Sequence, residues 1–328
     1  MGEVHAQTYF DYEGAELICV CDLNEKRARS VATRYRCGYV TDINKLAENP
    51  RIRGVIIATP DFAHTEPALK MIEAGKDVLI EKPLTTKVEE AREIVDEAKR
   101  RGVRIMVDFQ NRWNPVFASA KQAVSEGKIG KPVMGYARLS NPLQVPLKML
   151  SWASRSGPEW FLFPHILDLV GWLVKETPTE VYASGRRGIL EEKGVTAYDS
   201  IQAMVKFGSF FATLETSWIL PDSWPSLVDF NLMLLGSRGR IGAEGDRQGI
   251  DVAAEGYNWP FMLGLQEIYG KRLGFFRGPI IHFVDCLLKN EEPACTGEDG
   301  LRVTATIEAA LRSIKEGRSV SVKEIMEG

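Results

Sequence analysis

The residue with the clearest chemical promise is Lys82, which stands between Glu81 and Pro83 directly after an apolar run. The run at residues 77–80 is typical of a buried strand, after which a lone positive charge is costly to place. In an open parallel α/β sheet, ligands bind beyond the carboxyl ends of the strands. Lys82 therefore stands where a ligand is expected, and we predict that it is catalytic.

The elements that must position Lys82 alternate between strand and helix through the first third of the chain. Strands are predicted at residues 16–22, 54–59, 77–80 and 103–107, and helices at residues 25–36, 65–74 and 87–101. The last helix carries one apolar stripe and ends at Gly102; the stripe is made of Val88, Ala91, Ile94, Val95 and Ala98. This alternation predicts parallel pairing with right-handed crossovers.

The rhythm changes after about residue 112, where strand candidates follow one another. They lie at residues 133–139, 179–184, 200–207, 210–218 and 227–235, with helices at 164–174 and 301–314 and irregular segments at 152–158 and 257–277. Strands in succession favour an antiparallel sheet. We predict an α/β protein with a nucleotide-binding domain at 1–112 and an α+β domain at 113–328 whose open sheet is mostly antiparallel.

Composition excludes several classes of protein. The net charge is -3 and no basic block is present, so nucleic acid is not an expected partner. No apolar run approaches the ~18 residues that cross a membrane. Five cysteines without a CxxC spacing argue against a disulfide framework or a zinc site, so no metal is predicted and a reducing, cytoplasmic compartment is expected. Cys19 and Cys21 share one strand face and are expected to be buried.

The start of the chain departs from the usual dinucleotide-binding pattern. Such a domain begins with a buried strand that runs into Gly-x-Gly-x-x-Gly, whereas this chain opens on a predicted helix at residues 4–12. Gly2 would be the last glycine of the loop, and the first strand, which is central in this sheet, is absent. We expect the natural polypeptide to begin upstream of Met1; the alternative is a short variant that binds nucleotide poorly.

Several motifs, in order, resemble one family. They are Gly2-Glu-Val-His5-Ala6, Asp22, Ala58-Thr59-Pro60 with His64, Glu81-Lys82-Pro83, Gln110-Asn-Arg112-Trp-Asn-Pro115, Leu234–Arg240 and Gly297–Leu301. The resemblance is to the glucose–fructose oxidoreductase, inositol dehydrogenase and rhizopine-catabolism family (Gfo/Idh/MocA). It implies a Rossmann domain and a second domain whose open sheet often forms the dimer interface. It also implies hydride transfer between a nicotinamide and an alcohol or carbonyl, with Lys82 assisting proton transfer.

Residues on the predicted cofactor side have structural alternatives. Asp22 ends a strand and would accept hydrogen bonds from ribose hydroxyls, which favours NAD over NADP; alternatively it caps the next helix. Thr59 and Pro60 should turn the chain beneath the cofactor, and Gly2 is expected to bind the cofactor as well. His64 either contacts the cofactor or only caps and packs.

Three further residues complete the predicted cofactor side. Glu81 either orients nearby backbone or is solvated. Gln110 and Arg112 follow the next strand, where the family keeps residues near the nicotinamide. Asp108, just before them, departs from the small residue expected there.

On the substrate side, His165 is either a satisfied core histidine or, by its resemblance to the family's substrate-side histidine, catalytic. Asp168 lies three residues on, on the same helix face, and would orient His165 or bind a substrate hydroxyl. The acid that many members carry four residues before this histidine is replaced by Phe161. With Phe163, it gives the predicted pocket aromatic walls that suit the apolar face of a sugar ring.

The resulting hypothesis is an NAD-dependent oxidoreductase of a sugar, polyol or related hydroxy compound, in which Lys82 and His165 share the proton work. A homodimer or homotetramer is expected from the resemblance. Two alternatives remain: an enzyme that cleaves glycosides with NAD as a transient oxidant, and a non-catalytic dinucleotide- or sugar-binding regulator.

Overall fold

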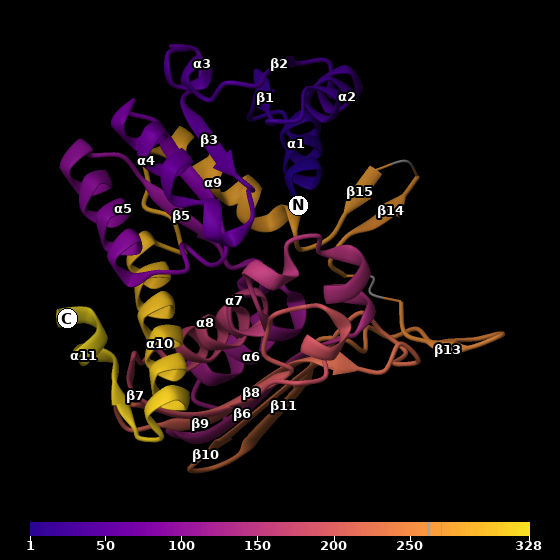
Figure 1. Cartoon of the computed structure of the whole chain (residues 1–328), viewed down its shortest axis with the longest axis vertical. Coiled ribbons are helices and arrows are strands. Elements are labelled where there is room, and N and C mark those ends of the chain that lie inside the picture. Colours follow the sequence, from indigo (N-terminus) through magenta and orange to yellow (C-terminus); the bar gives the residue numbers. More distant parts are fainter. Residues whose placement is uncertain (261–262, 270) are drawn as a thin grey trace. The chain divides into compact units, whose positions relative to one another are not determined.

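A computed structural model describes residues 1–260, 263–269 and 271–328 of the chain (Figure 1). The chain divides into two compact units. The first consists of Met1–Asp108 and Phe276–Leu301, and the second of Phe109–Phe275 and Arg302–Gly328. The chain therefore leaves the first unit after its last parallel strand and returns to it near the end.

The first unit alternates strands and helices as the sequence predicts. Its elements are α1 (Gly2–Asp11), β1 (Cys19–Cys21), α2 (Glu25–Tyr35), β2 (Gly38–Val40), α3 (Asn44–Ala47), β3 (Gly54–Ile57), η1 (Asp61–Ala63), α4 (Thr65–Glu73), β4 (Asp77–Glu81), α5 (Val88–Arg101), β5 (Ile105–Asp108) and α9 (Arg277–Lys289). The first turn of α10 (Gly297–Glu316) also belongs to it. The helices α3 and α9 and the short strand β2 are absent from the sequence prediction.

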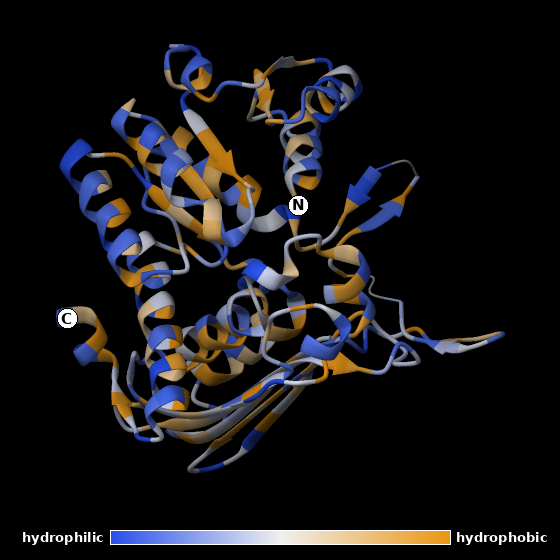
Figure 2. Ribbon diagram, viewed as in Figure 1, coloured by the Kyte–Doolittle hydropathy of each residue, from blue (hydrophilic) through white to orange (hydrophobic). Residues whose placement is uncertain are grey.

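The strands β3, β4 and β5 form a parallel sheet in that order. All five residues of β4 are buried, because α4 and α5 cover one face of the sheet and α9 packs on β4 and β5 from the other. Figure 2 shows the corresponding colouring, with hydrophobic strands and a hydrophilic outer surface on α5. This burial explains why β4 is a near-continuous apolar run rather than an alternating one.

The strands β1 and β2 form a separate two-stranded parallel sheet. Within the described residues no strand joins β1 to β3. The expectation that Cys19 and Cys21 are buried is wrong: Cys19 is half-buried and Cys21 is exposed. A three-residue strand that pairs on one side only has too little covering structure to bury both of its faces.

The second unit is built on a sheet of seven strands in the order β11-β10-β6-β9-β8-β7-β16. The strands are β6 (Pro132–Pro142), β7 (Pro178–Arg186), β8 (Ser200–Phe207), β9 (Phe211–Leu220), β10 (Asp229–Gly236), β11 (Arg240–Glu244) and β16 (Val320–Ser321). All neighbouring strands are antiparallel except β6 and β9. The predicted, mostly antiparallel open sheet is therefore confirmed.

Helices cover one face of this sheet. They are α6 (Pro115–Ser125), α7 (Pro158–Phe161), α8 (Phe163–Val174), the greater part of α10, and α11 (Val322–Glu327), with short turns η2 (Gln110–Trp113), η3 (Val145–Met149), η4 (Ala153–Arg155) and η5 (Glu191–Lys193). Burial alternates strictly along β8, which is typical of a sheet with one packed and one open face. The open face carries the partly exposed side chains of Tyr182 and Met204.

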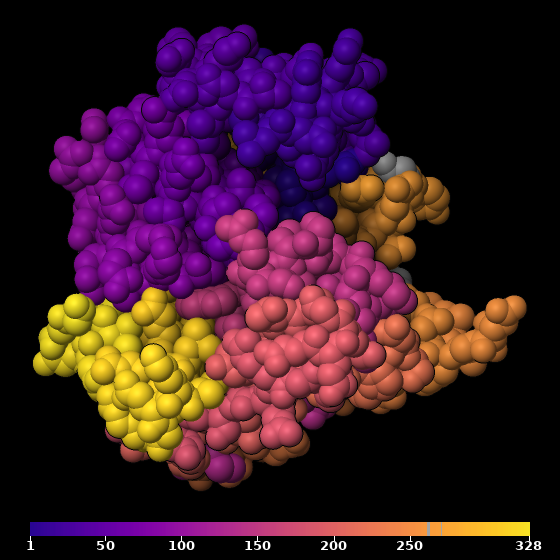
Figure 3. Space-filling model, in the orientation of Figure 1, coloured from indigo at the N-terminus to yellow at the C-terminus, as the bar shows by residue number. Residues whose placement is uncertain are grey.

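Short hairpins follow the sheet in the chain. They are formed by β12 (Val252–Ala253) with β13 (Tyr257–Asn258) and by β14 (Gln266–Ile268) with β15 (Lys271–Leu273). The prediction that residues 257–277 are irregular is therefore wrong where these strands lie; positions 261–262 and 270 fall outside the described residues. Figure 3 shows the β12–β13 segment, in orange, standing out from the rest of the second unit. No helix among the described residues has the length and apolar character that crossing a membrane requires.

Candidate active site

Lys82 follows β4 directly and is half-buried, at the carboxyl end of the parallel sheet. Burial lowers the pKa of its amine, while the negative charges of Glu81, Asp61 and Asp108 act in the opposite direction. The net result is a pKa below the ordinary lysine value, because the desolvation cost of the charged form outweighs the acidic neighbours. An amine with a lowered pKa can give and take a proton closer to neutral pH.

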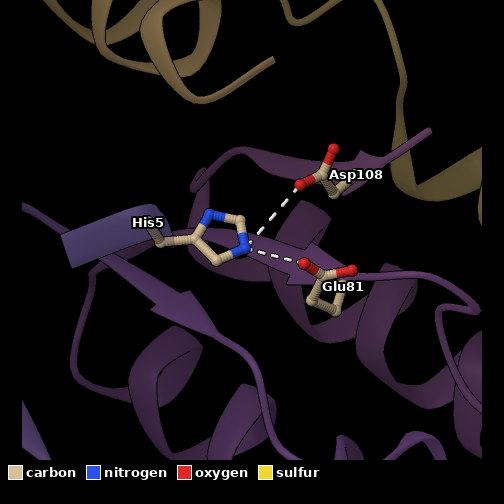
Figure 4. A group of neighbouring side chains, drawn as sticks. All are labelled: His5, Glu81 and Asp108. Atoms are coloured by element: carbon tan, nitrogen blue, oxygen red, sulfur yellow. Dashed lines mark hydrogen bonds and ion pairs between the residues drawn. The ribbon is translucent and has the colours of Figure 1, made fainter. Parts of the chain in front are cut away.

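Glu81 is buried at the last position of β4 and is committed to another side chain. Its Oε1 atom lies 2.7 Å from His5 Nε2, and the parallel register sets Glu81 opposite Asp108 (Figure 4). Burial tends to raise the pKa of Glu81, but the hydrogen bond with His5 and the charge of Lys82 act to lower it, and the net direction is down. Glu81 is therefore not solvated, and it bonds a side chain rather than the neighbouring backbone.

Two residues in this region were not predicted as site residues, namely His5 and Asp108. Ligand-type atoms of His5, Glu81 and Asp108 all lie within 4.8 Å of one another. Burial, and then the charge of Glu81, raises the pKa of Asp108 well above its ordinary value. The only signals in the sequence were the departure of Asp108 from a small residue and the place of His5 in the first motif.

His64 is fully buried and holds two loops together. Its Nδ1 atom lies 2.8 Å from the carbonyl oxygen of Pro83, and its Nε2 atom lies 3.0 Å from that of Thr59. Both ring nitrogens are occupied and no part of the side chain reaches the surface, so these contacts match the packing alternative, while contact with the cofactor stays a prediction. His64 thereby ties the turn after β3 to the segment that carries Lys82.

The turn after β3 contains the two other residues predicted beneath the cofactor. The Thr59 hydroxyl donates a hydrogen bond to the carbonyl oxygen of Ala63 at 2.8 Å, and Pro60 precedes the turn η1. Thr59 is exposed. Its hydroxyl therefore shapes the turn while its outer surface remains open.

Asp22 and Gly2 are arranged compatibly with a dinucleotide. Asp22 follows β1 and is half-buried, with its carboxylate 3.1 Å from Arg27 Nε and accepting from the Asn24 amide at 2.8 Å. The alternative reading of Asp22 as the helix cap is wrong, because the Asn24 side chain caps α2. Gly2 begins α1, and a Cβ atom there would lie 3.7 Å from Ala58 Cβ. An acid after a strand and a helix that starts beside the end of β3 are the features that hold a ribose and a pyrophosphate.

In the second unit, Arg112 and Asp168 form a buried ion pair. Arg112 Nε donates to Asp168 Oδ2 at 2.9 Å and Nη2 donates to Oδ1 at 2.5 Å. The two side chains are 10% and 4% exposed. The pair joins the turn η2 to the helix α8, so each residue is held by the other.

His165 lies in the first turn of α8, also in the second unit. Its Nδ1 atom is 3.3 Å from the side-chain nitrogen of Asn111. The residue His165 is 9% exposed to solvent. Gln110, its neighbour in η2, is similarly buried. The structure thus places His165 beside the Asn111–Arg112 segment, whereas the side chain of Asp168 pairs with that of Arg112.

Aromatic rings lie around Phe161, one of the two residues predicted to form aromatic walls of the pocket. The ring of Phe161 lies 5.9 Å from that of Trp152 and 5.8 Å from that of Trp218, measured between centroids. Phe163 is fully buried and belongs to the core. The residue that replaces the expected acid therefore packs among aromatic rings.

Two family descriptions match the chain. Residues 1–109 match the oxidoreductase family with an NAD-binding Rossmann fold (GFO_IDH_MocA), and residues 117–242 match the GFO/IDH/MocA C-terminal domain. The chain belongs to the GFO/IDH/MocA family. It is accordingly an NAD-dependent oxidoreductase, with a Rossmann-type first domain and a sheet-based second domain.

Relatives within the GFO/IDH/MocA family span nearly the whole chain. An inositol 2-dehydrogenase of Rhizobium meliloti (strain 1021) is 27% identical over 98% of this chain and 96% of its own length. The scyllo-inositol 2-dehydrogenase (NAD(+)) of Bacillus subtilis (strain 168) is 25% identical over 98% and 93%. The crystal structure of a putative myo-inositol dehydrogenase from Sinorhizobium meliloti 1021 aligns with a TM-score of 0.83 and 26% identity, covering 98% of this chain and 96% of that one.

Proposed function

We propose that this enzyme oxidises a secondary alcohol on a cyclic polyol or sugar, with NAD as the hydride acceptor, and catalyses the reverse reduction. The observation that carries the proposal is Lys82, an amine with a lowered pKa at the carboxyl end of a parallel sheet. The names of the relatives support the substrate class, since several are inositol dehydrogenases and one is a 1,5-anhydro-D-fructose reductase of Ensifer adhaerens.

The proposed chemistry gives each residue one task. Lys82 holds the reacting oxygen and takes its proton as the carbon–hydrogen bond gives up a hydride. His165 is the second proton-handling group, on the substrate side. NAD, when bound, supplies the hydride acceptor, and Asp22, Thr59, Pro60 and Gly2 would hold it.

We assign Asp168, Arg112 and Gln110 a supporting task in this scheme. Because Asp168 is occupied by both arms of Arg112, it acts through that residue rather than on a substrate hydroxyl. The pair fixes η2 against α8, and so fixes the segment beside His165. Asp168 and Arg112 are therefore positioning residues in this proposal.

One observation favours a second candidate function, a dinucleotide- or sugar-binding regulator. Phe161 occupies the position of the expected acid and packs against Trp152 and Trp218. The helix α7 therefore contributes an apolar ring where a charge was expected. An aromatic surface binds sugar rings without doing proton chemistry.

The test is a panel of inositols, sugars and anhydro-sugars, screened for reduction of NAD and, separately, of NADP. We expect turnover on at least one cyclic polyol, with a clear preference for NAD because the Asp22 carboxylate repels a 2′-phosphate. Cofactor that stays bound without net turnover would instead favour glycoside cleavage. Tight sugar binding with no turnover on any member would favour the regulator.

We also propose that the open sheet face joins two copies of the chain. It carries large exposed side chains, among them Tyr182, Met204 and Phe211, and a hollow lined by Tyr136, Arg138, Met233, Arg240 and Glu244. Apolar surface of this kind is typical of an association site. Light scattering after size exclusion should give a dimer or tetramer, and Met204→Lys should shift it towards monomer; a monomeric wild-type protein would contradict the proposal.

The five free cysteines are compatible with a cytoplasmic location.

A further inference from the structure

Three titratable side chains meet in the interior of the first unit, and the proposed reaction does not use them directly. They are His5 on α1, Glu81 at the end of β4 and Asp108 at the end of β5, with exposures of 2%, 7% and 1%. Figure 4 shows the His5 ring directed at both carboxylates. The parallel register of β4 and β5 makes Glu81 and Asp108 direct neighbours.

Only one of the possible contacts in this cluster is a hydrogen bond. His5 Nε2 lies 2.7 Å from Glu81 Oε1, whereas it lies 3.8 Å from Asp108 Oδ2, beyond hydrogen-bond distance. In the part of the chain that the structure describes, neither oxygen of Asp108 has a hydrogen-bond partner, and neither does His5 Nδ1. The cluster therefore pairs His5 with Glu81 and leaves Asp108 beside them.

The unpartnered Nδ1 atom of His5 fixes the charge of the imidazole. If the ring were protonated on both nitrogens, Nδ1 would present a buried N–H group without an acceptor, which is costly. The neutral ring with its proton on Nε2 donates to Glu81 and leaves only a lone pair on Nδ1. His5 therefore adds no positive charge to offset the carboxylates.

Two ionised carboxylates on neighbouring strands would then repel each other in a medium of low polarity. Adjacent strands are only ~4.8 Å apart, a distance at which like charges in a protein interior strongly favour protonation of one group. Glu81 keeps its charge because it accepts a hydrogen bond from His5. Asp108 has no such bond, and since an unpaired buried carboxylate costs far more than an unpaired neutral acid group, Asp108 is the member that holds a proton.

The other charged groups around the cluster act in both directions. Lys82 and the Met1 amino group favour the ionised forms of Glu81 and Asp108. Tyr9 faces Asp108 from α1 and remains a neutral phenol, because burial raises its pKa. Asp61 adds negative charge on the side of Lys82.

We propose that His5, Glu81 and Asp108 form one buried group in which Asp108 stays in its acid form, so that Glu81 carries the only negative charge of the cluster next to Lys82. The inference depends on the proposed role of Lys82 only for its functional consequence. A second full negative charge would hold the amine of Lys82 protonated, and the proton on Asp108 prevents this. A divalent ion does not fit as well, since ligand bonds of ~2.0–2.2 Å hold ligand atoms about 3 Å or more apart, farther than the 2.7 Å between His5 Nε2 and Glu81 Oε1.

The first test is stability as a function of pH in Asp108→Asn. A folded protein with a protonated Asp108 holds a proton that the unfolded chain releases above about pH 4, so wild type loses stability as the pH rises from there to the raised pKa. The variant lacks this loss. Its melting temperature should equal or exceed that of wild type near pH 8, and its advantage should shrink towards pH 5.

The matched control is Asp77→Asn, at the opposite end of β4. Asp77 is also buried, but it accepts a hydrogen bond from the Arg104 amide at 2.7 Å and lies 3.8 Å from the Arg104 guanidinium. This variant should lose stability near pH 8. If Asp108→Asn loses stability in the same way, Asp108 is ionised and the proposal is wrong. Stoichiometric divalent metal in the purified wild-type protein would also overturn it.

The second test connects the cluster to Lys82 through the pH dependence of kcat. Asp108→Asn preserves the charge next to Lys82, so the midpoint of the profile should stay within about 0.3 units of wild type. The double variant Asp108→Asn with Glu81→Gln has no carboxylate left in the cluster and should lower the midpoint by about one unit. If Asp108→Asn alone shifts the midpoint as far as the double variant, Asp108 is ionised and the proposal is wrong. If Lys82 proves not to be catalytic, the stability test still decides the state of Asp108.

Discussion

Replacing Lys82 with methionine should lower kcat by roughly a hundred- to ten-thousand-fold, the range expected when a positioned proton-transfer group is removed. Methionine keeps most of the apolar stem of this half-buried side chain, so packing beside Pro83 is largely retained. Only the group that handles the proton is removed. The affinity for NAD should change little, which fluorescence titration of the cofactor can establish separately.

The pH profile gives this prediction a second readout. Burial, opposed by the charges of Glu81 and Asp61, places the pKa of Lys82 below the ordinary lysine value. Alcohol oxidation by wild type should therefore rise with pH to a midpoint below about 10.4, as the amine becomes the free base. The methionine variant should lack this titration, and any residual activity should follow hydroxide or His165 instead.

Lys87→Met is the matched control for Lys82→Met. Lys87 lies four residues after Pro83 in the chain. Its side chain is exposed and pairs with that of Glu90 at 2.7 Å. Its replacement removes the same charge from the same segment and should leave kcat within about two-fold, since exposed ion pairs contribute little. Equal losses in the two variants, or full activity in Lys82→Met, would show that Lys82 does not take part in the reaction.

The strand–helix alternation around Lys82 could be predicted because each signal is local. The strand β4 is apolar throughout because both of its faces are buried, and the helix α5 has a single apolar stripe because only one of its faces is buried. The helix α9 could not be predicted in the same way. It stands after a long run of hairpins, and its role as the second cover of β4 and β5 depends on contacts that are remote in the sequence.

The candidate site divides in a similar way. Lys82 and Asp22 were identifiable because a charged residue directly after a strand is unusual and has a known use. The cluster of His5 with Asp108 was not, since a histidine on α1 and an acid on β5 become neighbours only when the sheet forms. The pairing of Arg112 with Asp168 could not be predicted, for the same reason. The sequence suggested that Arg112 lies near the nicotinamide and that Asp168 orients His165 or binds a substrate hydroxyl. In the structure the two side chains bond each other.

That ion pair leads to the second large effect. Asp168→Ala should lower the free energy of unfolding by about 3–5 kcal/mol, because it leaves the buried guanidinium of Arg112 without its carboxylate. A double variant with Arg112→Met should recover part of this loss, since no unpaired charge then remains. Denaturant unfolding of both single variants and the double variant measures the coupling between the two residues.

The exposed pair of Lys206 and Glu180 in the same unit serves as the control. Lys206 Nζ and Glu180 Oε1 are 2.8 Å apart, but the side chains are 56% and 37% exposed, so Glu180→Ala should lower the free energy of unfolding by no more than about 1 kcal/mol.

The comparison also distinguishes a positioning role of Asp168 from direct catalysis by it. If Asp168→Asn kept full stability and lost turnover, Asp168 would act on the substrate itself. If stability falls and the surviving folded enzyme binds NAD normally, the carboxylate acts by holding η2 against α8, and the activity of His165 depends on that hold.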